Sequence, residues 1–281
     1  MHLQWLYSGD IVVQIVALQG EDASATVVEP MNEDKRTFWN TRARMSEHSG
    51  TDDFVLQKLE ERELLRHIPF GSRVLDVGCG DGSLLALAAA ELGCTGEGLD
   101  FSSEFVERCR RRHEKVGLTF HLGSMLDVDA LVFGTFDVIT TKRSLINLDS
   151  AEEQLQVLEK LLRLLKPGGV MLVLESTIEG LERLNTLRRG FDLPDMEAPW
   201  HNRYFQASEL AEFAEHIDVA SLSTSDFAST YYLLSRVVNA HLANMNGLEM
   251  HYNDPVNVMA LDIPAYGNVG APRLHIIEKV A

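Results

Sequence analysis

Short apolar runs alternate with longer amphipathic segments through the middle of this chain, between residues 74 and 176. Most of the short runs are rich in Val, Ile and Leu, as buried strands are, whereas the segments between them repeat apolar side chains at helical spacing. Strands that alternate with helices form a parallel sheet with helices on both faces. The pattern predicts strands over residues 74–77, 96–99, 118–122, 136–141 and 170–175, and helices over residues 83–92, 103–115 and 151–166.

The parts of the chain on either side of this core predict additions to it. A final strand and its neighbour would form an antiparallel pair that completes a doubly wound, mostly parallel seven-stranded α/β sheet. Long insertions above strand ends usually form a cap over a ligand or a contact between subunits, so a homodimer is one possibility. The predicted additions are helices over 32–48, 53–67, 179–189, 208–215 and 229–245, strands over 217–224 and 273–280, and insertions over 179–206 and 228–271.

The first 30 residues stand apart from this pattern. They contain strand-like runs at 3–7 and 11–18 and a polar stretch that ends at Pro30; we interpret residues 1–30 as an N-terminal extension of a domain formed by residues 31–281. The start of the chain lacks a basic region and a small-residue cleavage site, and no stretch has the roughly 18 consecutive apolar residues of a membrane span. We therefore expect a cytoplasmic protein that does not bind membranes.

A glycine-rich turn is the most informative local feature. The run from Val74 to Gly82 predicts a buried strand, a turn containing three glycines, and a helix that begins at Ser83. Glycine lets a ligand approach the backbone closely, and the helix start offers unpaired N–H groups. Asp100 follows the next strand, where a carboxylate can accept hydrogen bonds from ribose hydroxyls. Together these features predict a nucleoside cofactor at the carboxyl ends of parallel strands.

The acids in and beside the turn narrow the choice of cofactor. The turn reads G-x-G-x-G rather than the G-x-G-x-x-G of a nicotinamide site, and Asp76 and Asp81 accompany it. Carboxylates beside a pyrophosphate would repel it, whereas they suit a ligand with an ammonium or sulfonium group. A nicotinamide enzyme is therefore disfavoured.

The run Leu75-Asp76-Val77-Gly78-Cys79-Gly80-Asp81-Gly82 closely resembles the first motif of class I S-adenosylmethionine-dependent methyltransferases. The resemblance continues in the same order along the chain, over residues 98–102, 120–127, 136–141 and 164–169, and covers about residues 70 to 176. It implies a Rossmann-like methyltransferase fold, S-adenosylmethionine as methyl donor and S-adenosylhomocysteine as product.

The same resemblance implies a set of cofactor residues at the ends of successive strands. Asp76 would face the methionine ammonium, directly or through water, Asp100 would hold the ribose, and Phe101 would pack on the adenine. Ser124 stands where the family often has an acid, so the partner of the adenine amino group would be Asp127 or lie elsewhere. The complete set is Asp76, Gly78, Cys79, Gly80, Gly82, Asp100, Phe101, Met125, Leu126 and Asp127, with Thr141 near the methyl-bearing end.

Two other segments offer residues for the methyl acceptor. Arg143 follows the fourth strand and could clamp a carboxylate or phosphate of the acceptor, or the cofactor's own carboxylate, or form a structural ion pair. His201 is the candidate general base, because its ordinary pKa lies near neutrality. Trp200 and Tyr204 would form an aromatic wall against the substrate or pack a corner between helices. Glu175, at the end of the fifth strand, competes as base or substrate ligand.

Composition restricts the partners of the enzyme. Among 281 residues, 42 acids outnumber 25 bases, and the formal charge of −17 should repel nucleic acid and anionic membranes. Three cysteines without C-x-x-C spacing and scattered histidines predict neither a disulfide framework nor a metal site.

These observations predict transfer of a methyl group to a small-molecule acceptor, most readily the hydroxyl of a sugar or another hydroxylated metabolite. Residues 143–148 and 200–202 look like those of methyltransferases from bacterial surface-polysaccharide and small-molecule pathways. Two alternatives stay open: methylation of a small-molecule amine, and a non-catalytic protein of the same fold that serves as a partner subunit.

Overall fold

The computed structural model describes residues 33–45, 51–113, 117–132 and 134–281. Residues 34–281 form one compact unit, to which the following description refers. The two strand-like runs expected within residues 1–30 lie outside the described residues.

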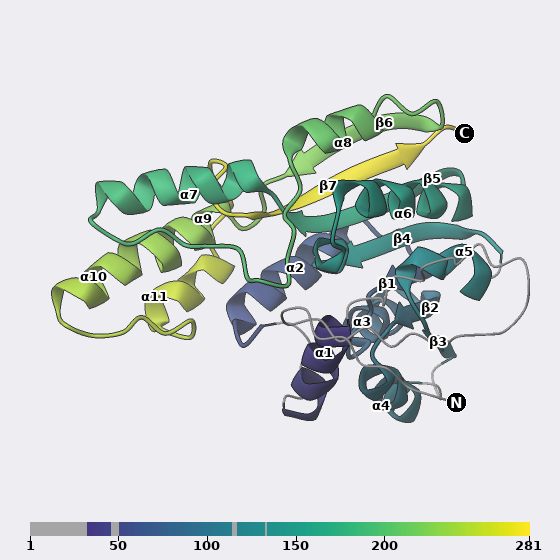
Figure 1. Cartoon of the computed structure of the whole chain (residues 1–281), viewed down its shortest axis with the longest axis horizontal. Helices are drawn as coiled ribbons and strands as arrows, with labels where there is room; N and C mark the ends of the chain where they lie inside the picture. The colour runs from purple at the N-terminus through teal and green to yellow at the C-terminus, as the bar shows by residue number, and fades with distance from the viewer. Residues whose placement is uncertain (1–32, 46–50, 114–116, 133) are drawn as a thin grey trace, which may run out of the picture. The chain divides into compact units, whose positions relative to one another are not determined.

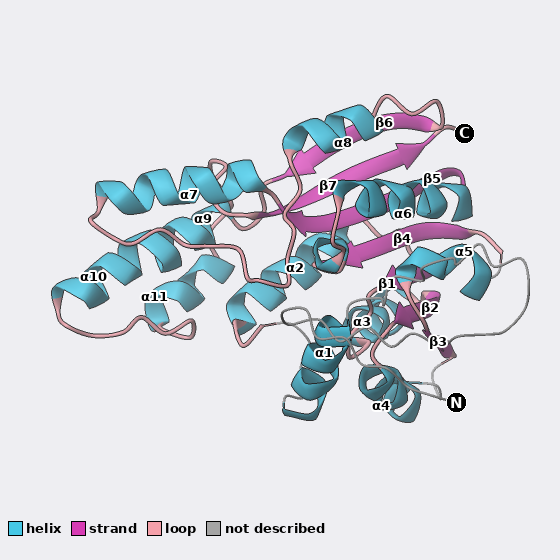
Figure 2. Cartoon of the chain, viewed as in Figure 1, coloured by secondary structure: helices cyan, strands magenta, loops and turns pink. Residues whose placement is uncertain are grey.

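One seven-stranded sheet runs through this unit in the order β3-β2-β1-β4-β5-β7-β6 (Figures 1 and 2). Neighbouring strands from β3 to β5 pair in parallel, and β7 runs antiparallel to both β5 and β6. This topology confirms the predicted fold class, including the antiparallel pair at the sheet's edge. The strands are β1 (Arg73–Val77), β2 (Thr95–Asp100), β3 (Leu118–Leu122), β4 (Phe136–Lys142), β5 (Leu165–Ser176), β6 (Val219–Ser225) and β7 (Pro272–Lys279).

Helices follow the strands as the alternating pattern predicts. Several begin at a residue whose side chain accepts a hydrogen bond from the first turn, such as Ser150 before α6 and Thr177 before α7. The helices are α1 (Glu33–Met45), α2 (Phe54–Arg66), α3 (Ser83–Leu92), α4 (Ser103–His113), α5 (Val128–Leu131), α6 (Ala151–Leu164), α7 (Ile178–Gly190), α8 (Ala207–Phe213), α9 (Ser229–Tyr232), α10 (Ala240–Met245) and α11 (Pro255–Val258), with short 3-10 turns η2 (Met125–Asp127), η3 (Leu145–Asn147) and η5 (Met259–Leu261).

The core has two layers because successive strand residues point to opposite faces of the sheet. Val74 and Leu172 belong to an apolar cluster that also contains residues of α2, α3 and α7. Leu75 and Met171, the neighbours of those two residues, belong to a second cluster formed with α6 and α8. The sheet is therefore covered on both faces, and ligands have access to it at the strand ends.

Two segments differ from the sequence prediction. The helix expected over 229–245 is interrupted by η4 (Leu233–Asn239), which has π-helical hydrogen bonding. The loop expected around Pro255 contains α11, in which proline occupies the first turn, where its missing N–H costs nothing. Hydrophobic periodicity does not distinguish a π-helical turn from an α-helical one, so this interruption was not predictable.

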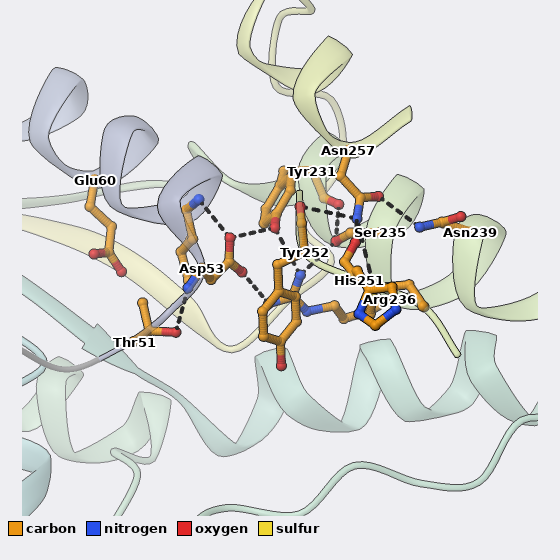
Figure 3. A network of polar contacts seen from close by, with 12 residues as sticks. Thr51, Asp53, Glu60, Tyr231, Ser235, Arg236, Asn239, His251, Tyr252 and Asn257 are labelled. Carbon is orange, nitrogen blue, oxygen red and sulfur yellow. Dashed lines mark hydrogen bonds and ion pairs between the residues drawn. The ribbon is translucent and has the colours of Figure 1, made fainter. Parts of the chain in front are cut away.

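The segment between β6 and β7 is fixed by a buried polar cluster (Figure 3). The guanidinium of Arg236 in η4 forms an ion pair with Asp53 and donates a 3.0 Å hydrogen bond to the hydroxyl of Tyr231. That hydroxyl donates to Asp53 Oδ1 over 2.6 Å, and the same oxygen caps α2 by accepting from Leu56 N. The cluster holds residues 228–271 against the start of α2, and Figure 1 shows α9–α11 beyond the end of the sheet toward which β4 points.

Candidate active site

A cavity of about 320 Å³ opens at the carboxyl ends of the parallel strands. In open α/β sheets this edge is where ligands bind. One half is formed by residues of the predicted cofactor motifs and their neighbours, which are Gly78, Cys79, Gly80, Leu99, Asp100, Phe101, Phe105, Gly123 and Met125. We call this the cofactor half. The other half, which we call the acceptor half because it contains the predicted acceptor residues Arg143, His201 and Tyr204, is formed by α1, the loop after β4, residues 199–204 and Tyr232.

The glycine turn lies against the loop that follows β4. Gly78 has a φ of 75°, and a Cβ built on it would lie 2.2 Å from Ser144 Cβ. Ser144 Oγ donates a 2.7 Å hydrogen bond to Val77 O, so the two loops are locked together. Only glycine fits at position 78, as the motif predicted, because both its φ and the close approach exclude a side chain.

Asp100 lies at the centre of the cofactor half. Its two carboxylate oxygens accept hydrogen bonds from Gly80 N at 2.8 Å and Ser102 N at 2.9 Å. Burial raises the pKa of Asp100 to about 6, although these backbone hydrogen bonds oppose the shift. Each oxygen keeps a second lone pair, so the carboxylate can also accept from a pair of ribose hydroxyls. The geometry fits the predicted role.

Asp76 lies deeper than expected. Its side chain is 2% exposed, does not line the cavity, and accepts a 2.8 Å hydrogen bond from Thr140 Oγ1. Burial raises its pKa to about 6, which the Thr140 hydroxyl opposes. Direct contact with a methionine ammonium does not follow from this position, so the role of Asp76 stays a prediction that requires a bridging water.

The wall around the predicted adenine is only partly the one expected. Phe101 and Met125 line the cavity, and Phe105 and Gly123 join them without having been predicted. Phe105 repeats the aromatic character of Phe101 one helical turn later, a signal that was present in the sequence. Leu126, Asp127, Gly82 and Thr141 do not line the cavity, so their contacts with the cofactor stay predictions.

Glu175 lies behind the cavity wall rather than in its lining, so its role as base or substrate ligand stays a prediction. The carboxylate is fully buried, and its Oε1 accepts from the N–H groups of Ser144 at 3.1 Å and Leu145 at 3.0 Å. Burial raises the pKa of Glu175 to about 7, and these hydrogen bonds oppose the shift. Glu175 therefore holds the loop after β4 in position.

Arg143 lines the acceptor half of the cavity and also forms an ion pair. Its Nε lies 3.0 Å from Glu60 Oε1, on α2, and its side chain keeps 19% of its exposure. Burial raises the pKa of Glu60, whereas the charges of Arg143 and Lys142 lower it. The structural ion pair is present, and a ligand role for the same side chain is compatible with this position.

His201 is surrounded by aromatic rings in the same half of the cavity. Its ring lies 4.5 Å from Phe38 between centroids, and Trp39 and Trp200 present T-shaped contacts at 5.6 and 5.3 Å. The buried Nδ1 has no hydrogen-bond partner among the described residues. Burial lowers the pKa of His201, and the charge of Lys35 lowers it further. The imidazole is therefore neutral near pH 7 and able to accept a proton.

The remaining predicted aromatic residues divide between the cavity and the surface. Tyr204 lines the cavity; burial raises its pKa, opposed by a hydrogen bond with Ser176 and the charge of Arg143. Trp200 does not line the cavity and is 65% exposed, so it supports the ring of His201 rather than forming the wall expected of it. Tyr232 lines the cavity from the C-terminal insertion, which no local pattern had indicated.

Comparison with known proteins agrees with this geometry. Residues 70–210 match the family described as a methyltransferase domain. The chain is 30% identical over 186 residues to the ubiquinone biosynthesis O-methyltransferase of Vibrio cholerae, which covers 60% of this chain and 71% of that protein. It is 38% identical over 102 residues to the corresponding protein of Vibrio parahaemolyticus, covering 36% of this chain and 42% of that protein. With this second relative the chain spans less than half of the relative's length.

A solved structure supports the fold. A methyltransferase from Haloferax volcanii, solved in complex with the Trm112 methyltransferase activator, superposes with a TM-score of 0.59 at 19% identity. The superposition covers 86% of this chain and 98% of that one. At this level of identity the likeness shows the fold alone.

The glycine cradle, which a single Cβ would fill, and the Asp100 carboxylate with its free lone pairs define an α/β protein that binds a nucleoside at its strand ends. The chain belongs to the methyltransferase-domain family and is a class I S-adenosylmethionine-dependent methyltransferase. The predicted cofactor is thus confirmed at the level of the family.

Two further features concern all the residues that the structure describes. No helix among them is long and apolar enough to cross a membrane. Within the same residues, no group of three His, Cys, Asp or Glu side chains is arranged to hold a metal ion.

Proposed function

We propose that this enzyme methylates a hydroxyl group of a small molecule and that His201 is the general base. The observation that carries the proposal is the position of His201 in the lining of the cavity's acceptor half, together with a buried Nδ1 that has no hydrogen-bond partner among the described residues. A depressed pKa keeps this imidazole unprotonated near pH 7. The relatives named O-methyltransferases support a hydroxyl acceptor.

In this in-line displacement, one group of residues binds the cofactor and His201 takes a proton from the acceptor. S-adenosylmethionine, when bound, supplies a methyl group on a positively charged sulfur. Asp100 and the glycine turn hold the nucleoside, and Phe101, Phe105 and Met125 pack around its base. The acceptor hydroxyl lies between this half and His201, which takes the proton as the oxygen attacks. Positioning the two reactants at contact distance supplies a large share of the rate enhancement.

The two insertions form the cap over the acceptor in this proposal. Residues 179–206 contribute Pro199, His201 and Tyr204 to the cavity, and residues 228–271 contribute Tyr232. A homodimer contact through the same insertions stays a prediction, as does a cytoplasmic location.

The alternatives find less support. A positively charged amine acceptor would need a carboxylate near it, but among the described residues that line the cavity Asp100 is the one acid, and it lies in the cofactor half. A non-catalytic partner subunit would have no reason to keep the glycine cradle and the Asp100 hydrogen bonds intact.

Replacement of His201 by Gln tests the proposed base. We expect kcat to fall by about two to four orders of magnitude, because proton removal by a positioned base contributes that much. At saturating S-adenosylmethionine, where protonation of Asp100 does not limit binding, kcat of the parent enzyme should fall as the pH drops below the ordinary histidine value of 6.5, since the lowered pKa keeps the base form present down to that region. In His201→Gln this acidic limb disappears.

For His201→Gln and the parent enzyme, we would measure the pH profile of turnover and the affinity for S-adenosylhomocysteine by titration. The affinity for S-adenosylhomocysteine is the control, and it should change less than about threefold because His201 lies in the acceptor half. Unchanged turnover with an unchanged acidic limb would remove His201 as the base.

A further inference from the structure

Arg143 is held more firmly than an arginine on a surface loop would be. Its backbone is left-handed, with a φ of 52°, which is an unfavourable conformation for a residue with a side chain. The conformation persists because Arg143 N donates to Leu174 O at 2.8 Å and its carbonyl accepts from Asn147 Nδ2 at 3.1 Å. The origin of the side chain is therefore fixed at the cavity's edge.

A buried acid orients the guanidinium from behind. Glu60 is wholly buried, and its Oε1 faces Arg143 Nε at 3.0 Å. Among the described residues, no acceptor takes a hydrogen bond from the two Nη groups of Arg143. A guanidinium has five N–H donors, and its paired Nη groups match the two oxygens of a carboxylate. The Nη edge of Arg143 is therefore left to pair with an anion in the cavity that this residue lines.

The charges around the cavity favour an anion in this half. The described residues that line it include three permanent cations, Arg42, Lys142 and Arg143, in a protein of net charge −17. Arg42 is paired with Asp52 at 2.9 Å, and Lys142 lies 3.9 Å from Glu61, so each has its acid outside the cavity wall. Arg42 and Lys142 thus have acid partners of their own, and Arg143, whose Nη groups have no acceptor among the described residues, is the cation best placed to bind an anionic acceptor.

We propose that the methyl acceptor carries a carboxylate, which Arg143 binds through its two Nη groups while the hydroxyl to be methylated faces His201. The assignment rests on the proposed function, which supplies the hydroxyl and its base. Glu60 acts as a positioning residue through its ion pair with the Nε side of the guanidinium, in which the 3.0 Å contact is not a hydrogen bond. The proposal selects hydroxy acids from the broader class of hydroxylated metabolites.

The test compares matched acid and amide probes on the complex of the full chain with S-adenosylhomocysteine. The probes are dihydroxybenzoate with dihydroxybenzamide and glucuronate with glucuronamide, and binding is measured by isothermal titration. At least one acid should bind about tenfold more tightly than its amide, the effect of one charge-assisted pair. Arg143→Gln should abolish that preference, and Arg143→Lys should restore only part of it, because an ammonium lacks the paired Nη groups.

Two controls make the outcome decisive. Arg189→Gln removes an arginine from an exposed ion pair with Asp195, distant from the cavity lining, and should leave the acid preference unchanged. The affinity of Arg143→Gln for S-adenosylhomocysteine should stay within about threefold of the parent value. A large loss of that affinity with an intact acid preference would assign Arg143 to the cofactor's carboxylate and overturn the proposal.

The remaining outcomes separate this inference from the proposed function. If no acid binds better than its amide in the parent enzyme, the inference is wrong, even where the probes are methylated. If acids bind preferentially through Arg143 but no hydroxyl probe accepts a methyl group, the carboxylate site at Arg143 stands, and the transfer to a hydroxyl facing His201 is refuted.

Discussion

Asp100→Ala should weaken binding of S-adenosylhomocysteine by about a hundredfold or more. The substitution removes the carboxylate that can accept from both ribose hydroxyls, and hydrogen bonds to a charged group contribute about 1.5–3 kcal/mol each. It also leaves Gly80 N and Ser102 N without their acceptor, so the glycine turn loses its link to β2. Isothermal titration measures the loss.

Two further variants show whether the loss is specific. Asp137→Ala removes a carboxylate that also accepts a hydrogen bond from a backbone N–H, that of Arg73. Asp137 lies at the start of β4, whereas Asp100 lies at the end of β2, so the two are at opposite edges of the parallel sheet. Its affinity for S-adenosylhomocysteine should stay near that of the parent. Asp100→Asn keeps one acceptor oxygen and should bind weakly but measurably. Affinity near the parent value in Asp100→Ala would refute the assignment of the ribose.

The raised pKa of Asp100 adds a dependence on pH. Binding uses the charged carboxylate, and burial raises its pKa to about 6 in the folded protein. The affinity for S-adenosylhomocysteine should therefore be constant above pH 7 and fall as the pH drops through 6, where the carboxyl becomes protonated.

Arg236→Met should destabilise the protein by about 3–5 kcal/mol, the largest effect on stability that we expect. Arg236 and Asp53 are 5% and 0% exposed in their side chains, and removing the arginine leaves a buried carboxylate without its counter-charge. This ion pair joins the start of α2 to η4 (Figure 3). Its loss should therefore also loosen the insertion formed by residues 228–271. Urea denaturation followed by circular dichroism measures the change.

The matched control is Arg189→Met, which breaks the exposed ion pair with Asp195 and should cost less than about 1 kcal/mol. In the double variant Asp53→Asn with Arg236→Met, neither of the two positions carries a charge, and the side-chain oxygen of the introduced asparagine can still accept the hydrogen bond from Leu56 N that caps α2. The double variant should therefore be more stable than Arg236→Met alone. If Arg236→Met were as stable as the parent, the polar cluster would not be what fixes the insertion.

The sequence by itself determined the sheet and, in the cofactor half of the cavity, the glycine turn and the position of Asp100. Strands and helices in residues 70–176 follow from local periodicity, and the conformation of the glycine turn depends on residues that are neighbours in the chain. Asp100 was identifiable for the same reason, because the end of a strand places its side chain at the sheet's edge. The π-helical turn within 229–245 was not predicted, because its apolar spacing resembles that of an α-helix.

Only the tertiary structure decided the acceptor half. Glu175 and Trp200 occur where a sequence pattern suggests ligands, yet one is buried behind a loop and the other is largely exposed. Tyr232 enters the cavity because Asp53 and Arg236, 183 positions apart, form an ion pair in the core. Such contacts depend on which buried charges meet after the chain has folded. Periodicity along the sequence does not show which residues so far apart in the chain will pair.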